Sequence, residues 1–342
     1  MPKPSRVDII KQIETLRGST VLTFLTSLRP NVLTQMADDA VRICFDHLLL
    51  FPERPVEKLD VYLCSNGGSG TVPWRLVALF REFAKSLSVL IPYRAYSAAS
   101  LLALGADEIV MHPFAELGPI DPTVSNDFNP AEQNTGRRLG ISVEDVRAYV
   151  NFIKSTVGIT HEDELIKAIE ILATNVHPLA LGNVERFLSQ SRMIAKKILR
   201  THMAEAEEHT IDTIVENMAS KLYFHGHPIN RQEAKTDLSL KVVDDLQPGL
   251  ESAMWELYKD YEAEFENQSV FNPAGDLAAV VPQQGQVPQR EYTLVHAMIE
   301  TTRLSSRHTT KRRYALTQGP MPGQQMLRED VLSQGWSHST IP

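Results

Sequence analysis

Strand-like runs alternate with helical runs between residues 20 and 111, and this alternation constrains the fold more than any other feature. Helical spacing of apolar side chains marks residues 31–50, 74–87 and 98–106. The β-rich runs between them are VLTFLTS (21–27), LDVYLC (59–64), SVLIPY (88–93) and EIVM (108–111). Because their connections are short, we predict a parallel α/β core.

Two turns of small residues lie where predicted strands give way to helices. The first is SNGGSG (65–70), after LDVYLC, and the second begins at Ser97, after SVLIPY. A serine at such a turn can expose its hydroxyl, and main-chain N–H groups at helix starts can hold an anion. Together these turns have the parts of a serine hydrolase site.

The chain changes character after Pro122. We predict a helical insertion at about 123–205, within a first domain of residues 1–250. Residues 251–342 form the predicted C-terminal appendage: a helix to about 267, a Pro/Gln-rich linker (268–290) and a hairpin of EYTLVHAMIETT with KRRYAL. The last twenty residues look irregular.

Composition excludes several classes of function. The net charge of −8 disfavours nucleic-acid and anionic-membrane partners. The N-terminal run MPKPSRVDIIKQIE is charged where a signal peptide needs an apolar core, and no apolar run is long enough to span a bilayer, so we expect a cytoplasmic protein. Cys44 and Cys64 are expected to be reduced core residues.

No cofactor or metal is expected. The chain has no GxxxxGK[ST] or GxGxxG motif, so it is not its own ATPase or a dinucleotide enzyme. His225 and His227 lack further ligands nearby and favour a turn. Basic residues near the C-terminus favour the solvated side of a hairpin over a partner surface: Arg303, Arg307, Lys311, Arg312 and Arg313.

Taken together, three separated elements resemble the Clp-type serine peptidases, above all the serine dehydrogenase proteinase family and the related signal-peptide-peptidase-A enzymes. They are SNGGSG (65–70), AYSAASLLALGADEIVM (95–111) and ELGPIDP (116–122), and the layout of residues 221–246 resembles the closing segment of those enzymes. The resemblance implies a ClpP/crotonase-like spiral of ββα units and hydrolysis of peptide bonds. It matches Ser97 to the nucleophile, and Gly68 and the Ala98 N–H to the oxyanion donors. Ser100, one helical turn on, is expected to pack.

The general base has no clear match. Where Clp peptidases carry histidine this chain has Pro119–Pro122, and where some relatives carry lysine it has Arg137 and Arg138, which are poor bases. The candidates, which all stay open, are Asp121 in the GPIDP turn, His177 before a long helix, Lys154 on the insertion and, less favoured, His112.

The resemblance also implies partners: a peptide or unfolded protein as substrate and further copies of the chain in a homo-oligomer. A separate ATPase partner, which some relatives use, stays open. Two alternatives remain from the residues alone. One is a crotonase-like acyl-CoA enzyme that uses the paired donors without a serine nucleophile. The other is a non-catalytic Clp-fold scaffold that has lost its base.

Overall fold

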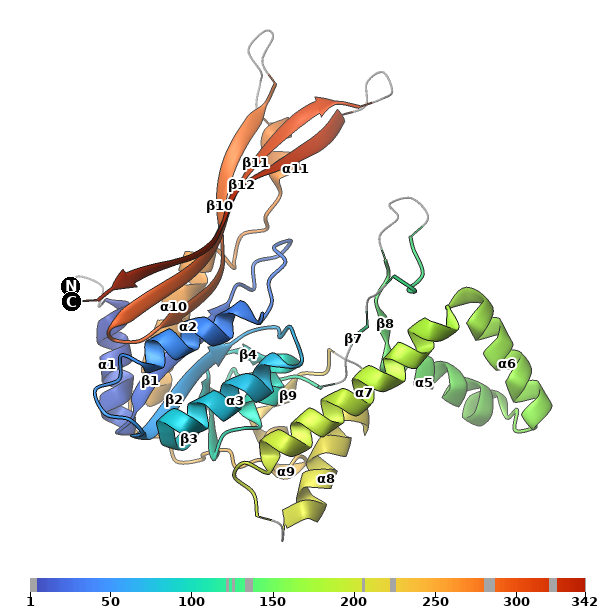
Figure 1. Cartoon of the computed structure of the whole chain (residues 1–342), viewed down its shortest axis with the longest axis horizontal. Coiled ribbons are helices and arrows are strands. Elements are labelled where there is room, and N and C mark those ends of the chain that lie inside the picture. Colours follow the sequence, from blue (N-terminus) through green and yellow to red (C-terminus); the bar gives the residue numbers. More distant parts are fainter. Residues whose placement is uncertain are drawn as a thin grey trace.

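The computed structural model in Figure 1 describes residues 5–120, 123–124, 127–132, 138–204, 207–221, 226–279, 287–319 and 325–341. A compact body carries two projections, one formed by strands near the C-terminus and one by helices from the middle of the chain. Both chain ends lie on the same side of the body.

The body is built on a sheet whose order, among the described residues, is β12-β11-β10-β1-β2-β3-β5. Its parallel half consists of the strands predicted from the alternating pattern: β1 (Thr20–Thr26), β2 (Val56–Cys64), β3 (Ala84–Ile91) and β5 (Glu108–Met111). The antiparallel half consists of β10 (Gln289–Glu300), β11 (Leu304–Gln318) and β12 (Gln325–Thr340). The predicted parallel α/β core is therefore confirmed.

Helices cover both faces of the parallel strands. One face packs against α1 (Arg6–Arg17) and α10 (Leu250–Phe265), and their shared core includes the fully buried Tyr62 and Tyr261. The other face packs against α2 (Asp39–Leu48), α3 (Val72–Phe83) and α4 (Ala98–Ala103). These two apolar layers hold the ends of β2 and β3 in fixed positions.

A second, small sheet lies beside the strand ends. It joins β4 (Arg94–Ala95), β6 (Glu116–Leu117) and β9 (Ile229–Asn230). The Asn230 side chain caps α9 (Arg231–Thr236). The expected last strand at LKVV is reduced to a single bridge between Val242 and Ile109.

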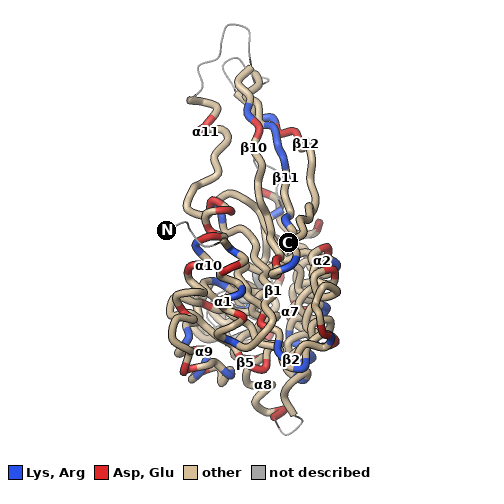
Figure 2. Tube along the Cα trace, turned by 90° about the vertical axis from the view of Figure 1, so that its left-hand side faces the viewer, with Lys and Arg blue, Asp and Glu red and all other residues tan. Residues whose placement is uncertain are grey.

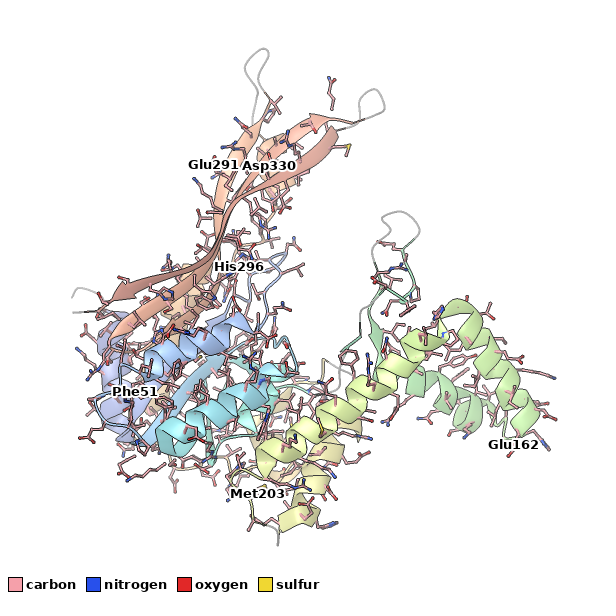
Figure 3. The ribbon with its side chains drawn as sticks, viewed as in Figure 1. Phe51, Glu162, Met203, Glu291, His296 and Asp330 are labelled. Atoms are coloured by element: carbon pink, nitrogen blue, oxygen red, sulfur yellow. The ribbon has the colours of Figure 1, made fainter. Side chains whose placement is uncertain are left out.

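The helical insertion forms the second projection. It contains β7 (Thr123–Val124), β8 (Ile141–Ser142), α5 (Val143–Asn151), the π-helix η1 (Phe152–Val157), α6 (Glu162–Asn175) and α7 (Pro178–Leu199). The chain then returns through α8 (Glu208–Glu216) and η3 (Asn217–Lys221). Figure 3 shows Glu162 at the far end of this projection, and α6 has no buried side chain.

The C-terminal region differs from the prediction in two ways. Strand β10 pairs with β1, and α10 packs on α1, so the boundary at residue 250 does not separate two packed units. Residues 325–340, predicted to be irregular, form β12, because their main chain pairs along β11. Inside the predicted linker, α11 (Pro273–Ala278) packs its Leu277 side chain under Tyr314.

Two helix limits are also corrected. The helix predicted for 31–50 begins only at Asp39, because Met36 is held in an extended bridge to Gly68. The helix predicted for 74–87 ends at Phe83, because Ala84 already pairs with β2. In both cases a long-range main-chain contact overrides the local helical pattern.

Basic residues run along β11, as Figure 2 shows, and they have acidic partners. Lys311 and Arg313 pair with Glu291 on β10, and Arg312 pairs with Glu329 on β12. These residues therefore link β10, β11 and β12, which form the projection near the C-terminus that we call the C-terminal arm.

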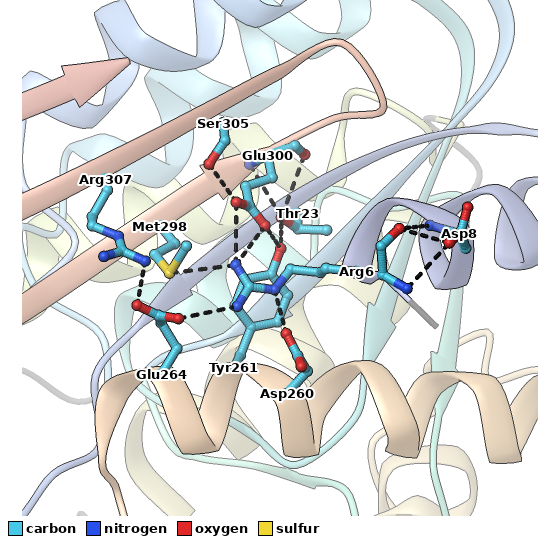
Figure 4. A network of polar contacts seen from close by, with 11 residues as sticks. Arg6, Asp8, Thr23, Asp260, Tyr261, Glu264, Met298, Glu300, Ser305 and Arg307 are labelled. Atoms are coloured by element: carbon cyan, nitrogen blue, oxygen red, sulfur yellow. Dashed lines mark hydrogen bonds and ion pairs between the residues drawn. The ribbon is translucent and has the colours of Figure 1, made fainter. Parts of the chain in front are cut away.

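An ion-pair network around Arg6 joins the first helix to the rest of the body (Figure 4). Arg6 of α1 donates to Asp260 of α10 at 2.7 Å and pairs with Glu300 of β10 at 3.1 Å. The guanidinium also lies over the Tyr261 ring. This network links α1 to α10 and to β10. No helix within the described residues has the length and apolar character that crossing a membrane requires.

Candidate functional site

Ser97 lies in a strained turn between β4 and α4. Its main chain has φ 52° and ψ −114°, a combination that residues with a side chain rarely adopt. It occupies the N-cap position of α4, yet its side chain makes no capping hydrogen bond. Serine at the start of a helix usually caps it with its hydroxyl, and Ser97 does not.

Neighbouring strands fix the turn that carries Ser97. Ser65, at the end of β2, bridges to Ala95: the Ser65 N–H donates to Arg94 O at 2.8 Å, and the Tyr96 N–H donates to Ser65 O at 2.9 Å. This pairing brings the SNGGSG turn alongside the serine turn, although about thirty residues separate them in the chain.

The two turns touch at Gly67. A Cβ atom built on Gly67 would lie 2.6 Å from Tyr96 O, 2.9 Å from Ser97 Cβ and 3.0 Å from Ala98 N. Gly67 also has φ 99°, which favours glycine. Only a residue without a side chain permits this approach.

Two main-chain donors at this contact are unused. Among the described residues, the structure records no acceptor for the N–H of Gly68 or for that of Ala98, the first residue of α4. Gly68 lies between two residues whose main chains are bonded: Met36 N–H donates to Gly67 O at 2.8 Å, and Ser69 N–H donates to Met36 O at 2.9 Å. Two main-chain N–H groups without acceptors, in turns that touch each other, are the kind of donors that an oxyanion requires.

Hydrogen bonds to the Ser65 side chain hold the glycine turn in place. The buried Ser65 hydroxyl accepts from the Gly67 N–H at 3.0 Å and from the Thr26 hydroxyl at 2.8 Å. Sequence reasoning missed Met36, Ser65 and Thr26 as supports. Ser65 and Thr26 could have been suspected from the sequence, because each is a hydroxyl residue at the end of a predicted strand. The role of Met36 could not, because it depends on the long-range bridge to Gly68.

The segment after β5 lies against the serine turn. Gly118 approaches the Tyr96 ring so closely that a Cβ on Gly118 would lie 2.9 Å from it. The buried Ser100 hydroxyl donates to the main-chain oxygens of Ala95 and Gly118 at 2.6 and 2.7 Å. The packing role expected for Ser100 is confirmed, and its bonds hold residues 116–120 beside the site.

The candidate bases are spread out. Asp121 is outside the described residues, directly after the buried Ile120. His177 is exposed and caps α7, with its Nδ1 accepting from Leu179 N–H at 3.2 Å. Lys154 is exposed on η1. The structure records no contact of His177 or Lys154 with Ser97.

Other histidines have structural partners. The His112 ring stacks on Trp255, with ring centres 5.0 Å apart, and burial lowers the pKa of His112. His227 contacts Glu233 at 2.7 Å, while His225 is outside the described residues. Within the described part of the chain, no group of three or more His, Cys, Asp or Glu residues is arranged to hold a metal ion.

Comparison with known proteins shows which family the region around the candidate site resembles. Residues 3–135, which include β1, the glycine turn, Ser97 and β6, match the family of ClpP-like SDH-type serine proteinases. Residues 3–135 therefore have a ClpP-like α/β fold of the kind found in SDH-type serine proteinases.

Two curated relatives come from Methanocaldococcus jannaschii. The uncharacterized protein MJ1495 is 29% identical over 128 residues, covering 35% of this chain and 42% of the relative. The chain thus matches less than half the length of that protein. The uncharacterized protein MJ0137 is 22% identical over 263 residues, covering 75% of this chain and 79% of the relative.

Solved structures of the 1510-N membrane-bound stomatin-specific protease are also similar. One variant aligns with a TM-score of 0.36 and 13% identity, covering 66% of this chain and 80% of that one. A second variant, bound to a substrate peptide, aligns with a TM-score of 0.38 and 14% identity, covering 66% and 75%.

Proposed function

We propose that this chain is a serine protease that cleaves peptide bonds through an acyl-enzyme on Ser97. The observation that carries the proposal is the contact of the Gly67 turn with Ser97 and Ala98, beside two unused N–H donors. The Ser97 turn is strained and its hydroxyl does not cap the helix, so the hydroxyl is available for attack.

In the proposed reaction, Ser97 Oγ forms a bond to the scissile carbonyl carbon while a general base accepts the hydroxyl proton. The Gly68 and Ala98 N–H groups donate to the oxygen that becomes negative. The C–N bond then breaks, the amine leaves with that proton, and water releases the acyl group and restores the serine.

The base remains one of the predicted candidates. Asp121 is favoured by position, because it follows the segment that Ser100 and Gly118 hold against the serine turn. His177 and Lys154 are exposed on the insertion and would have to reach the site from there. We expect peptides or unfolded proteins as substrates, a cytoplasmic location, and a homo-oligomer whose contacts cover exposed apolar side chains of α6 such as Ile166 and Ile169.

A fluorophosphonate probe tests the assignment directly. The full chain is expected to be labelled at Ser97, and Ser97→Ala is expected to abolish both labelling and cleavage of an unfolded protein such as casein. Ser69→Ala, in the adjacent glycine turn, is the matched control and keeps both. Turnover of an acyl-CoA without labelling would instead support a crotonase-like enzyme.

The same probe ranks the bases, because labelling by a fluorophosphonate needs an activated serine. Asp121→Asn is expected to slow labelling by about 10²–10⁴-fold, the usual contribution of a general base. Lys154→Met and His177→Gln are compared in parallel. If none of the three slows labelling, the base lies elsewhere.

A further inference from the structure

A second cavity lies where the C-terminal arm meets the body, apart from the Ser97 turn. It has a volume of about 670 Å³, within the range of about 300–1,000 Å³ typical of ligand sites. Its walls come from the 33–40 segment on one side and from β10, β11 and β12 on the other. Figure 3 shows His296, one of its lining residues, at the base of the arm.

Buried polar atoms without partners belong to three residues that line this cavity. They are Nε2 of His296, Oγ1 of Thr310 and Nε of Arg312. Thr310 is only 1% exposed, so water does not satisfy its hydroxyl. A buried polar group without a partner destabilises the fold, and finding three in one wall points to a ligand that pairs with them.

The chemistry of these atoms defines the ligand. The His296 ring is partly buried and its Nε2 has no partner; a nitrogen of a neutral imidazole accepts or donates a hydrogen bond according to the tautomer. Thr310 and Arg312 each offer a donor. The wall therefore needs a neutral group that carries an N–H and a C=O together, and the peptide unit is such a group.

The remaining lining suits a peptide with apolar side chains. Phe24, Ala297 and Trp336 line the cavity, and Leu33 at its edge is 96% exposed. The acidic side chains in the wall already have partners: Asp39 accepts from Trp336 Nε1 at 2.7 Å, and Asp38 pairs with Arg75. The Asp38 charge is therefore balanced by Arg75, and the Asp39 carboxylate already accepts one hydrogen bond from the wall itself.

We propose that this cavity is an exosite that binds a segment of polypeptide. The proposal rests on the proposed function, a serine protease that acts on polypeptides, and does not depend on the assignment of Ser97.

The exosite shares a segment with the candidate active site. Leu33 and Ala37 line the cavity, and Met36 between them holds the Gly67–Ser69 turn through two main-chain hydrogen bonds. Peptide bound in the cavity therefore packs against the segment that supports the oxyanion donors. A long substrate could occupy both sites at once, which raises its effective concentration at the nucleophile.

Binding is tested with the full chain carrying Ser97→Ala, which prevents turnover. The probe is N-acetyl-Ala-Val-Ala-amide, and calorimetry measures its affinity. Thr310→Val is expected to weaken binding about 5–10-fold through the loss of one hydrogen bond. Thr309→Val, the neighbouring strand position that does not line the cavity, is expected to leave the affinity unchanged.

A thermal melt separates binding from folding. Because Thr310→Val removes an unsatisfied buried hydroxyl, the empty variant is expected to melt at the same temperature as its parent or higher. Weaker binding by a protein of equal or greater stability is a result that a purely structural role for Thr310 would not give.

A photo-reactive version of the peptide, with benzoylphenylalanine in place of valine, locates the site. Crosslinks are expected in residues 33–40, 296–312 or 334–336. Crosslinks confined to residues 65–70 and 96–98 would place the peptide in the catalytic site alone and overturn the exosite. Equal affinity for Thr310→Val and its parent, or binding of uridine or maltose but not of the peptide, would overturn it as well.

Discussion

Gly67 and Ser97 are in contact across two turns that lie thirty residues apart in the chain: a Cβ on Gly67 would lie 2.9 Å from Ser97 Cβ. The contact exists because Ser65 pairs with Ala95, which places the end of β2 beside β4. The position of the proposed nucleophile relative to its oxyanion donors is therefore set by main-chain pairing.

Gly67→Ala is expected to reduce kcat by at least about 10²-fold, comparable to the loss of one oxyanion donor. The new methyl group would press on Ala98 N and Tyr96 O, and the φ of 99° adds strain. Peptidase assays measure the loss. Gly70→Ala is the control, because a Cβ there meets nothing within 4 Å. Equal losses in both variants would show that the contact has no catalytic importance.

Ser97→Gly is expected to stabilise the fold while removing the nucleophile. Relief of the unusual φ and ψ is worth about 1–3 kcal/mol, offset by the roughly 0.5–1 kcal/mol that glycine loses through its freer unfolded chain. Urea unfolding should therefore give a gain of about 1 kcal/mol. Ser69→Gly, where φ is not positive, should lose stability. If Ser97→Gly lost as much stability as Ser69→Gly, the main chain at Ser97 would not be strained.

Arg6→Met is expected to destabilise the protein by about 3–5 kcal/mol, because the carboxyl group of Glu300, whose side chain is only 7% exposed, loses its cationic partner. Urea unfolding measures the change. The matched control is Arg42→Met, whose ion pair with Asp46 is on the surface and is worth about 0.3–0.5 kcal/mol. Similar small effects from both variants would mean that the network in Figure 4 does not bind α1 to the sheet.

His47 is expected to make stability depend on pH. Its Nε2 contacts the Ser306 hydroxyl at 2.8 Å, and burial, followed by the nearby His338, lowers the pKa of His47 to about 4. Since the folded pKa lies below the unfolded value, the unfolded state binds the proton first. The contribution of neutral His47 to the free energy of unfolding is complete above about pH 6.5 and is lost as the pH falls toward 4.

Urea unfolding between pH 7 and 5 measures this loss, which is about 1–2 kcal/mol for one such buried group. His47→Gln keeps a hydrogen-bonding group for Ser306 without a proton that titrates in this range, so its stability should fall less over the same interval. An unchanged slope would show that another group, such as His202 with its pKa also lowered to about 4, dominates.

The strands and most helices of the body were predictable because apolar periodicity reports which side of an element is buried. β1, β2, β3 and β5, the long α7 and the β10–β11 hairpin all follow such patterns. Strand β12 was missed because it is an edge strand with mostly exposed side chains, so it carries no burial pattern. Its strand form comes from pairing with β11.

The sequence alone determined the alternating core, the two small-residue turns and Ser97 as the serine at the second turn, since these depend on local spacing and on where glycine is tolerated. Only the tertiary structure decided that Gly67 meets Ser97, that Met36 supports the glycine turn, and that polar atoms of the arm converge on one cavity. Those relations join segments distant in the chain, and local preferences contain no information about which distant main chain or side chain will be the partner.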